Sequence, residues 1–325
     1  MISKGIGQTP CWFLAGKGLQ LLLTGLGVSL ITFILMHLAP GDAAEIWLRN
    51  LPGMPAEATL QSAREQLGLQ KPWIEQYIIW LANAVRFNLG ISFRTGEPVT
   101  QEILQRLPAT LELATGAFLF MVCVSLLLGT GGTLFARRWP DQVIRVWTVA
   151  VTSLPGYWLG LLLIFFFAVK LHLLPSMGRG GILHLILPAI TLGLGLSAVS
   201  SQVVRATMME VLSQDYIKLA RAKGLSTWQV LTRHVLINAL PPLVTTWGLS
   251  LGHLLGGSAI VETIFSWPGL GSLLIESISQ RDYPVTMGCV VFLTIIFVSI
   301  NFLVDIIHGC LDPRVRKESG NYAPQ

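Results

Sequence analysis

Charge is scarce in this chain of 325 residues, since Asp, Glu, Lys and Arg together make up only 12% of it. A soluble domain usually carries about 25% charged residues. This deficit, together with 52% hydrophobic residues and a mean hydropathy of +0.64, excludes an ordinary soluble protein and indicates a membrane protein. The formal net charge is +5, but the basic residues lie beside apolar segments. That distribution is typical of membrane proteins, so nucleic acid is not an expected partner.

Residues that carry chemistry are also few and scattered. The four cysteines contain no C-x-x-C pair and lie in or beside apolar stretches: Cys11, Cys123, Cys289 and Cys310. The six histidines form no ligand pattern, so no metal site is predicted. The phosphate-binding loop G-x-x-x-x-G-K-[ST] is missing, because Gly16-Lys17-Gly18 has neither its spacing nor its Ser or Thr. We therefore predict that the chain is not an enzyme, has no cofactor of its own and does not hydrolyse ATP by that route.

Long hydrophobic runs, in contrast, recur along the whole chain. A helix needs about 20 apolar residues to cross a bilayer core, and only helices pair all backbone groups of such a segment in lipid. Six segments qualify: 19–38, 111–136, 143–169, 185–208, 236–261 and 285–308. The sequence therefore predicts an all-α integral membrane protein with six transmembrane helices. The first run is longer than the apolar core of about 7–15 residues in a signal peptide, so we expect it to remain uncleaved.

The distribution of Lys and Arg predicts the orientation. Thirteen of them lie in the N-terminus, the 137–145 turn, the 205–233 segment and the tail, against three in the two short opposite loops. Both termini are therefore expected in the cytoplasm. The predicted organisation is a cytoplasmic N-terminus (1–18), a first transmembrane helix (19–38), an external loop (39–107), a transmembrane core (108–309) with a cytoplasmic loop (210–235), and a cytoplasmic tail (310–325).

The external loop has its own helical signals. Its stretches Glu57–Leu67 and Trp73–Arg86 are helix-like and are separated by Gly68 and Pro72. We expect it to form a small ordered cap.

The cytoplasmic loop between the fourth and fifth spans predicts two short helices. Ser213 can cap the first helix, and Asp215 favours its positive N-terminal end. Gly224 supplies a C-terminal stop. Ser226 and Gln229 form a capping box that begins the second helix. The expected result is a helix, a sharp turn and a helix.

The first of these helices carries small residues in a row. At helical spacing the helix carries Tyr216, Ile217, Ala220 and Gly224. Ala220 and Gly224 leave a flat patch with little side chain, flanked by Arg221 and Lys223. A flat, short helix of this kind fits a groove on a partner protein. The alternative is a helix that lies on lipid headgroups with its basic residues facing phosphate. The residues alone leave both interpretations open.

This loop resembles the coupling loop of permeases of binding-protein-dependent ABC importers, in their peptide/nickel branch. The resemblance runs from Asp215-Tyr216 through Ala220–Gly224 to Arg233-His234, Asn238-Ala239 and Pro241. The general motif, Glu-Ala-Ala followed by Gly, is kept at Ala220 and Gly224, with Lys218 and Leu219 in its first two places. Further matches follow in order along nearly the whole chain: Pro40-Gly41-Asp42, Leu67–Pro72, Gln76-Tyr77, Trp80-Leu81, Leu89–Ser92, Leu107–Ala114, Phe265–Gly271, Arg281–Pro284, Asp305 and Asp312–Arg314. Two departures are Ala43, where proline is usual, and Asn88, where aspartate is frequent.

The resemblance implies a type I ABC importer permease fold and a bacterial cytoplasmic (inner) membrane location. It implies a permease that forms half of a translocation pore together with a second homologous permease, two ATP-binding subunits and an external solute-binding protein. ATP and magnesium would be used by those partners. The residues expected to couple this chain to the ATPases are Asp215, Tyr216, Ala220, Arg221, Lys223 and Gly224.

The substrate expectation rests on the third outer loop and on the Leu107–Ala114 and Phe265–Gly271 stretches, which also look most similar to nickel-type permeases. The loop's short Pro175–His184 segment is similar to that of nickel-type B permeases, with dipeptide B-type permeases next. We therefore expect nickel or a metal–metallophore complex as substrate, with a dipeptide or oligopeptide as the alternative.

Small residues on two spans predict close helix contacts. Gly248, Gly252 and Gly256 recur at a spacing of four on the fifth span, which favours close backbone approach in lipid. This contact is either packing inside one subunit or a subunit interface. Gly193, Ser197 and Ser201 on the fourth span have the same spacing and form a candidate partner surface.

Charged and polar residues within the spans need a reason, because each is costly in lipid. Glu112, His253 and Glu262 are candidate pore-lining residues. The alternatives are local pairing or snorkelling for the two glutamates, as for Asp305, and ordinary packing for the histidine. An ion-gradient-driven secondary transporter is a competing class, but it would need inverted repeats and midplane charges. A membrane enzyme would need clustered catalytic groups.

Overall fold

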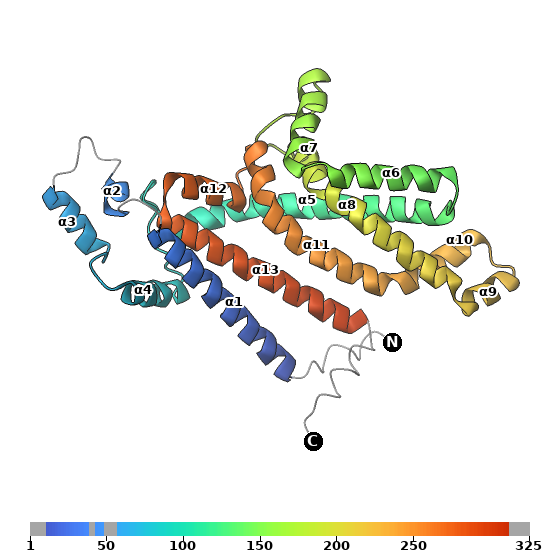
Figure 1. Ribbon diagram of the computed structural model, residues 1–325, viewed down its shortest axis with the longest axis horizontal. Helices are drawn as coiled ribbons and strands as arrows, with labels where there is room; N and C mark the ends of the chain where they lie inside the picture. The colour runs from blue at the N-terminus through green and yellow to red at the C-terminus, as the bar shows by residue number, and fades with distance from the viewer. Residues whose placement is uncertain (1–10, 39–42, 49–56, 312–325) are drawn as a thin grey trace. The chain divides into compact units, whose positions relative to one another are not determined.

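The computed structural model describes residues 11–38, 43–48 and 57–311, and the regular elements of these segments are helices (Figure 1). The segments 1–10, 39–42, 49–56 and 312–325 lie outside the described residues. The expectations for Pro40-Gly41-Asp42, for the first part of the cytoplasmic N-terminus and for nearly all of the tail therefore stay predictions.

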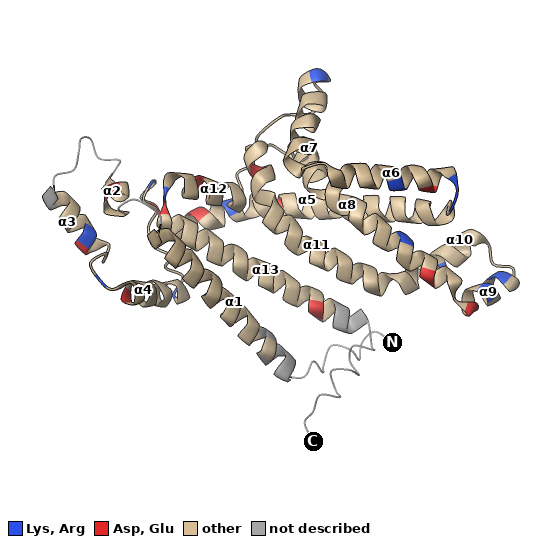
Figure 2. Ribbon diagram, viewed as in Figure 1, with Lys and Arg blue, Asp and Glu red and all other residues tan. Residues whose placement is uncertain are grey.

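Among the described residues, five helices are long and apolar enough to cross a membrane. They are α1 (Cys11–Leu38), α5 (Val99–Leu134), α8 (Ile182–Ser213), α11 (Leu236–Ile264) and α13 (Tyr283–Leu311). They contain the predicted first, second, fourth, fifth and sixth spans. Helix α5 begins at Val99, before the predicted start at residue 111. Its first turns bury Val99 and Ile103 but contain too many polar residues to be recognised by hydropathy. Figure 2 shows that most charged residues lie towards helix ends and in connections.

The third span is not the single straight helix that the apolar run 143–169 predicts. The span consists of helix α6 (Trp139–Ser153), then α7 (Gly156–Leu163) with its π-helical continuation η1 (Ile164–Lys170). The chain bends by 103° between α6 and α7. The cause is Pro155, which has no backbone N–H and disfavours helical geometry in the preceding residue. Leu154 accordingly adopts extended dihedrals, with φ −87° and ψ 131°. The expectation of one continuous third helix is therefore wrong, and six spans are present only if this bent pair counts as one.

The chain divides into two compact units, and the helices α5 and α13 each contribute to both. The first unit contains described residues 112–265 and 299–311, and the second contains 11–38, 43–48, 57–111 and 266–298.

In the first unit, α8 packs against α6, α7 and α11. Small residues allow this close packing, because a Cβ at Gly129 of α5 would lie 2.5 Å from Val204, and one at Gly193 would lie 2.7 Å from the Ala117 carbonyl oxygen. The short helices α9 (Asp215–Ala222) and α10 (Thr227–Val230), followed by the π-helical turn η2 (Leu231–Val235), connect α8 to α11.

The second unit contains the predicted cap. Helices α3 (Glu57–Gln66) and α4 (Trp73–Val85) confirm the two predicted helical stretches, and α12 (Leu270–Gln280) precedes α13. The structure adds α2 (Ala43–Leu48), which is too short for a visible periodicity. Helix α2 packs on α3 through a small cluster of Ala44, Leu48, Leu60 and Ala63.

Candidate functional site: the elbow between α8 and α11

The connection between α8 and α11 forms a fixed elbow, which we define as residues 214–230. Helix α9 ends in a Schellman motif, in which the N–H of Gly224 donates to the carbonyl of Arg221 (3.0 Å) and that of Leu225 donates to Ala220 (3.3 Å). Gly224 has φ +82°, a left-handed conformation that L side chains rarely adopt. The predicted stop at Gly224 is therefore confirmed.

The start of α9 differs from the prediction. Ser213 is the last residue of α8, and its hydroxyl donates back to the carbonyl of Glu210 (2.7 Å). Gln214 takes the N-cap position without a side-chain hydrogen bond. The predicted cap by Ser213 is therefore wrong, because local bonding to the preceding turn competes with capping. Asp215 does lie in the first turn, where it pairs with Lys218 (2.8 Å).

The capping box at the second helix is confirmed. The Ser226 hydroxyl accepts from the N–H of Gln229 (3.3 Å), and the Gln229 amide oxygen accepts from the N–H of Ser226 (3.0 Å). The helix that begins there is not a separate short one, however, since 227–264 is helical without a break. It passes through one π-helical turn, and no breaker residue stands between Val230 and Leu236 to end it.

The prediction that Ala220 and Gly224 form an open, flat surface on α9 is wrong for Ala220, which lies on the inward face of the helix. Ile217 is fully buried and Ala220 is only 7% exposed, and both belong to a core cluster with Met208 and Val230. Helical spacing alone could not reveal this orientation. Ala220 therefore anchors the elbow to its own subunit and does not form part of an open patch with Gly224.

The outward face of the elbow is apolar and aromatic. Tyr216 is 44% exposed, Leu219 59% and Trp228 68%. Arg221 and Lys223 are exposed beside them. Large apolar side chains held outward at a rigid, polar-rimmed turn indicate a surface that contacts another molecule.

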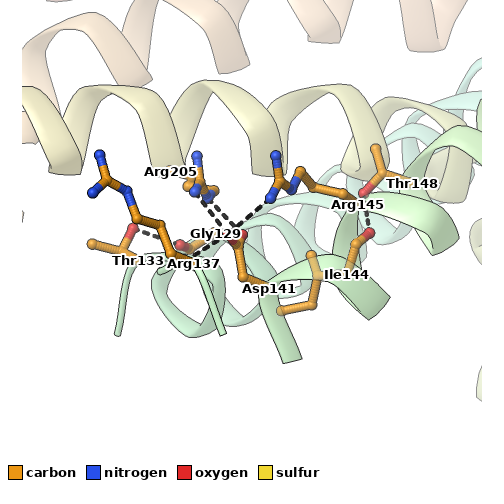
Figure 3. A network of polar contacts seen from close by, with 8 residues as sticks. All are labelled: Gly129, Thr133, Arg137, Asp141, Ile144, Arg145, Thr148 and Arg205. Atoms are coloured by element: carbon orange, nitrogen blue, oxygen red, sulfur yellow. Dashed lines mark hydrogen bonds and ion pairs between the residues drawn. The ribbon is translucent and has the colours of Figure 1, made fainter. Parts of the chain in front are cut away.

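A buried carboxylate, which was not predicted from the sequence, contacts helix α8, which leads into the elbow. Asp141, in the first turn of α6, is fully buried and accepts a bidentate pair of bonds from Arg205 of α8, at 2.8 and 2.9 Å (Figure 3). It also accepts from the N–H of Arg137 (3.1 Å) and from the guanidinium of Arg145 (3.4 Å). We call Asp141 and Arg205 the clamp.

The clamp ties the elbow to the corner between α5 and α6. Arg205 lies about two turns before the end of α8. A Cβ at Gly132 would come within 3.0 Å of its side chain, so the glycine makes room for it. In the sequence, Arg137, Arg145 and Arg205 indicated only which side of the membrane their loops occupy. The signal that could have revealed the clamp is a single aspartate, Asp141, in a short turn rich in arginine.

The glycine stripe of α11 packs tightly against a neighbouring helix at Gly248 and has no described neighbour at Gly256. A Cβ at Gly248 would lie 2.2 Å from Val304 of α13, and Gly252 is buried. A Cβ at Gly256 would meet no described atom within 4 Å. On α8, the residues expected as a partner surface are buried, and Gly193 lies against α5.

The three candidate pore-lining residues have different surroundings. Glu112 pairs with Arg179 at 2.6 Å, which confirms the local-pairing alternative for this residue. Glu262 is fully buried, and His253 is exposed. Asp305 is half-buried. A pore-lining role for His253 and Glu262 stays a prediction. Within the described segments, no three His, Cys, Asp or Glu side chains form a group that could hold a metal ion.

Comparison with known proteins gives matches over most of the chain. Residues 121–317 match the family described as binding-protein-dependent transport system inner membrane component, and residues 11–114 match its N-terminal counterpart. The chain is similar to the glutathione transport system permease protein GsiC of Escherichia coli (strain K12), with 39% identity over 290 residues, which cover 89% of this chain and 94% of the relative. GsiC of Shigella flexneri serotype 5b matches with the same identity and coverage.

Among solved structures, the chain is similar to a chain of the inward-facing MetNI methionine ABC transporter. The TM-score is 0.56 at 21% identity, over 65% of this chain and 96% of the other. At this identity the likeness concerns the fold.

Proposed function

Because the chain belongs to the family of binding-protein-dependent transport system inner membrane components, we propose that it forms half of the translocation pore of an importer of short peptides. The chain is a permease subunit of an ABC importer, with the all-α type I fold, in the bacterial inner membrane. It is not the catalytic subunit, and ATP hydrolysis with magnesium is proposed for partner subunits. The proposed complex adds a second homologous permease, two ATP-binding subunits and an external solute-binding protein, with both termini of this chain in the cytoplasm.

The observation that carries the proposed mechanism is the outward face of the elbow. Tyr216, Leu219 and Trp228 offer apolar area for a groove on an ATP-binding subunit, while Arg221 and Lys223 are placed to meet acidic groups at its rim. Lipid headgroups are the alternative partner.

Transmission of force requires that the elbow move as one piece. The Schellman motif fixes the end of α9, the capping box fixes the start of α10, and Ile217 holds α9 in the core. A push on the elbow is therefore passed to α8. The clamp carries it on to α5 and α6, because Asp141 joins α8 to their corner at two points. Closure of the ATPases would in this way switch the permease between two discrete packings.

The relatives favour the peptide alternative over the expected metal substrate. GsiC is named as a permease for glutathione, which is a short peptide, and it matches 89% of this chain. The resemblance of the Pro175–His184 loop to nickel-type permeases is a shorter and weaker signal. We therefore propose a glutathione-like short peptide as substrate.

The test is uptake by the complete importer. The chain is assembled with its ATPases, second permease and binding protein in vesicles, and labelled glutathione, a dipeptide, and nickel with and without a metallophore are compared. ATP-dependent uptake of glutathione or the dipeptide supports the proposal. If only free nickel or only the nickel–metallophore complex is taken up, and neither peptide is, the peptide assignment is contradicted and the metal assignment is supported.

A further inference from the structure

Helix α4 is apolar, yet each of its residues is at least partly exposed. One side of it lies on α1. The Tyr77 hydroxyl lies 2.8 Å from that of Ser29 and donates to the carbonyl of Leu26 (3.3 Å), and the Gln76 amide oxygen lies 3.1 Å from His37 Nε2. These contacts fix both the position and the rotation of α4.

The contacts place α4 at a definite depth along α1. Phe33 lies between the two contact points, and its ring meets that of Tyr77 edge to face at 5.4 Å. Helix α4 therefore crosses α1 near Phe33, five residues before Leu38, which is about 7.5 Å along the helix axis. Helices that lie in a bilayer surface insert to about 5–10 Å. A bilayer whose surface lies level with Leu38, the last described residue of this candidate span, would place the crossing of α4 at that depth.

The rotation of α4 separates an apolar side from a polar one. Tyr77 reaches towards the middle of α1 and Gln76 towards its end, so the two define the inward and outward directions. On the inward side, one stripe recurs at spacings of four, four and three: Ile74, Ile78, Ala82 and Val85. Ile74 and Val85 are each 75% exposed. Asn83 lies on the opposite face, while Glu75 borders the stripe next to Ala82 and pairs with Lys71 at 2.7 Å.

The aromatic residues of α4 also fit a position at the membrane–water interface. Trp73, Tyr77 and Trp80 lie on or near the side that meets α1, and the ring of Trp73 lies 5.3 Å from that of His37. Tryptophan and tyrosine are enriched where a membrane meets water. The neighbouring face of α1 is itself open, with Leu30, Ile34 and other large apolar residues exposed.

We propose that α4 is an interfacial helix whose stripe of Ile74, Ile78, Ala82 and Val85 inserts among the lipid acyl chains of the leaflet at the Leu38 end of α1. We assign lipid because α1, on which α4 lies, also exposes large apolar residues, and because a bilayer level with Leu38 puts the stripe at the depth that an interfacial helix occupies. The segment between the first two spans is then partly a membrane anchor as well as a cap. This inference is independent of the elbow and of the substrate.

The test measures what surrounds the stripe in the assembled complex. The four native cysteines are replaced, a single cysteine is placed at Ile78, and a nitroxide is attached in the complete importer in lipid nanodiscs. Collision with oxygen, which concentrates among acyl chains, is compared with collision with a water-soluble nickel chelate. Oxygen is expected to dominate at Ile78→Cys and the chelate at Asn83→Cys, which is the matched control on the opposite face of the same helix.

Two results would overturn the proposal. If the chelate dominates at Ile78→Cys, the stripe lies in water. If both reagents are excluded, a protein surface such as the second permease or the binding protein covers it. Val85→Cys, at the other end of the stripe, gives a second reading if the first variant fails to assemble.

Discussion

Breaking the clamp should uncouple ATP hydrolysis from transport. Asp141→Asn keeps the shape of the side chain but removes the charge that Arg205 meets at 2.8 and 2.9 Å. Removing one partner of a buried ion pair costs roughly 3–5 kcal/mol. Because the Arg205 side chain stays 26% exposed and water can partly solvate it, we expect a loss of about 2–3 kcal/mol. The released α8 should then move without carrying α5 and α6.

The assay has a thermodynamic and a functional part. Thermal unfolding of Asp141→Asn, Arg205→Gln and the double variant gives the coupling energy of the pair, which we expect to be about 1–3 kcal/mol. Substrate transported per ATP hydrolysed is measured in vesicles and should fall, while ATP hydrolysis persists. Arg145→Gln is the matched control, because this arginine is 56% exposed and its contact is 3.4 Å. It should cost at most about 0.5 kcal/mol.

Two outcomes would refute this reasoning. A coupling energy near zero would show that the bidentate pair does not hold α8 to α6. An unchanged ratio of transport to hydrolysis in a stably assembled Asp141→Asn importer would show that the clamp holds the fold without transmitting motion.

Three further changes test the elbow and the packing around it. Leu219→Asp should abolish co-purification of the ATPases by placing a charge in the docking face, whereas Lys218→Ala, on another face of the same helix, should leave it intact; equal yields would contradict docking. Gly224→Ala should cost about 1–2 kcal/mol, because φ is +82°, and lower transport; an unchanged melting temperature would contradict the strain argument. Gly248→Ala should lower thermal stability by overpacking, by about 1–3 kcal/mol, while Gly256→Ala should be tolerated; the reverse order would contradict the packing described.

Local signals in the sequence predicted much of the fold. Five spans follow from hydrophobic length, and the Ser226–Gln229 box and the Gly224 stop follow from residues whose backbone preferences act within a few positions. Pro155 carried an equally local signal for the bend in the third span, but the continuous apolar run around it outweighed that signal in the prediction.

What the sequence could not predict depends on tertiary packing. Helical spacing grouped Tyr216, Ile217 and Ala220 together with Gly224. Only the core formed by α5, α8 and α11 determines that Ile217 and Ala220 face inward while Tyr216 is exposed. Asp141 and Arg205 are 64 residues apart, so no local pattern joins them. The same holds for α4, because its apolar stripe indicates an interfacial helix only once its crossing point on α1 is known.

The central claim is that the outward face of the elbow receives an ATP-binding subunit, and photo-crosslinking from position 219 tests it most directly. A photoreactive residue replaces Leu219, which is 59% exposed, in the complete importer in lipid nanodiscs. We expect a crosslinked product with an ATP-binding subunit. A product with lipid, or with the external binding protein, would contradict it.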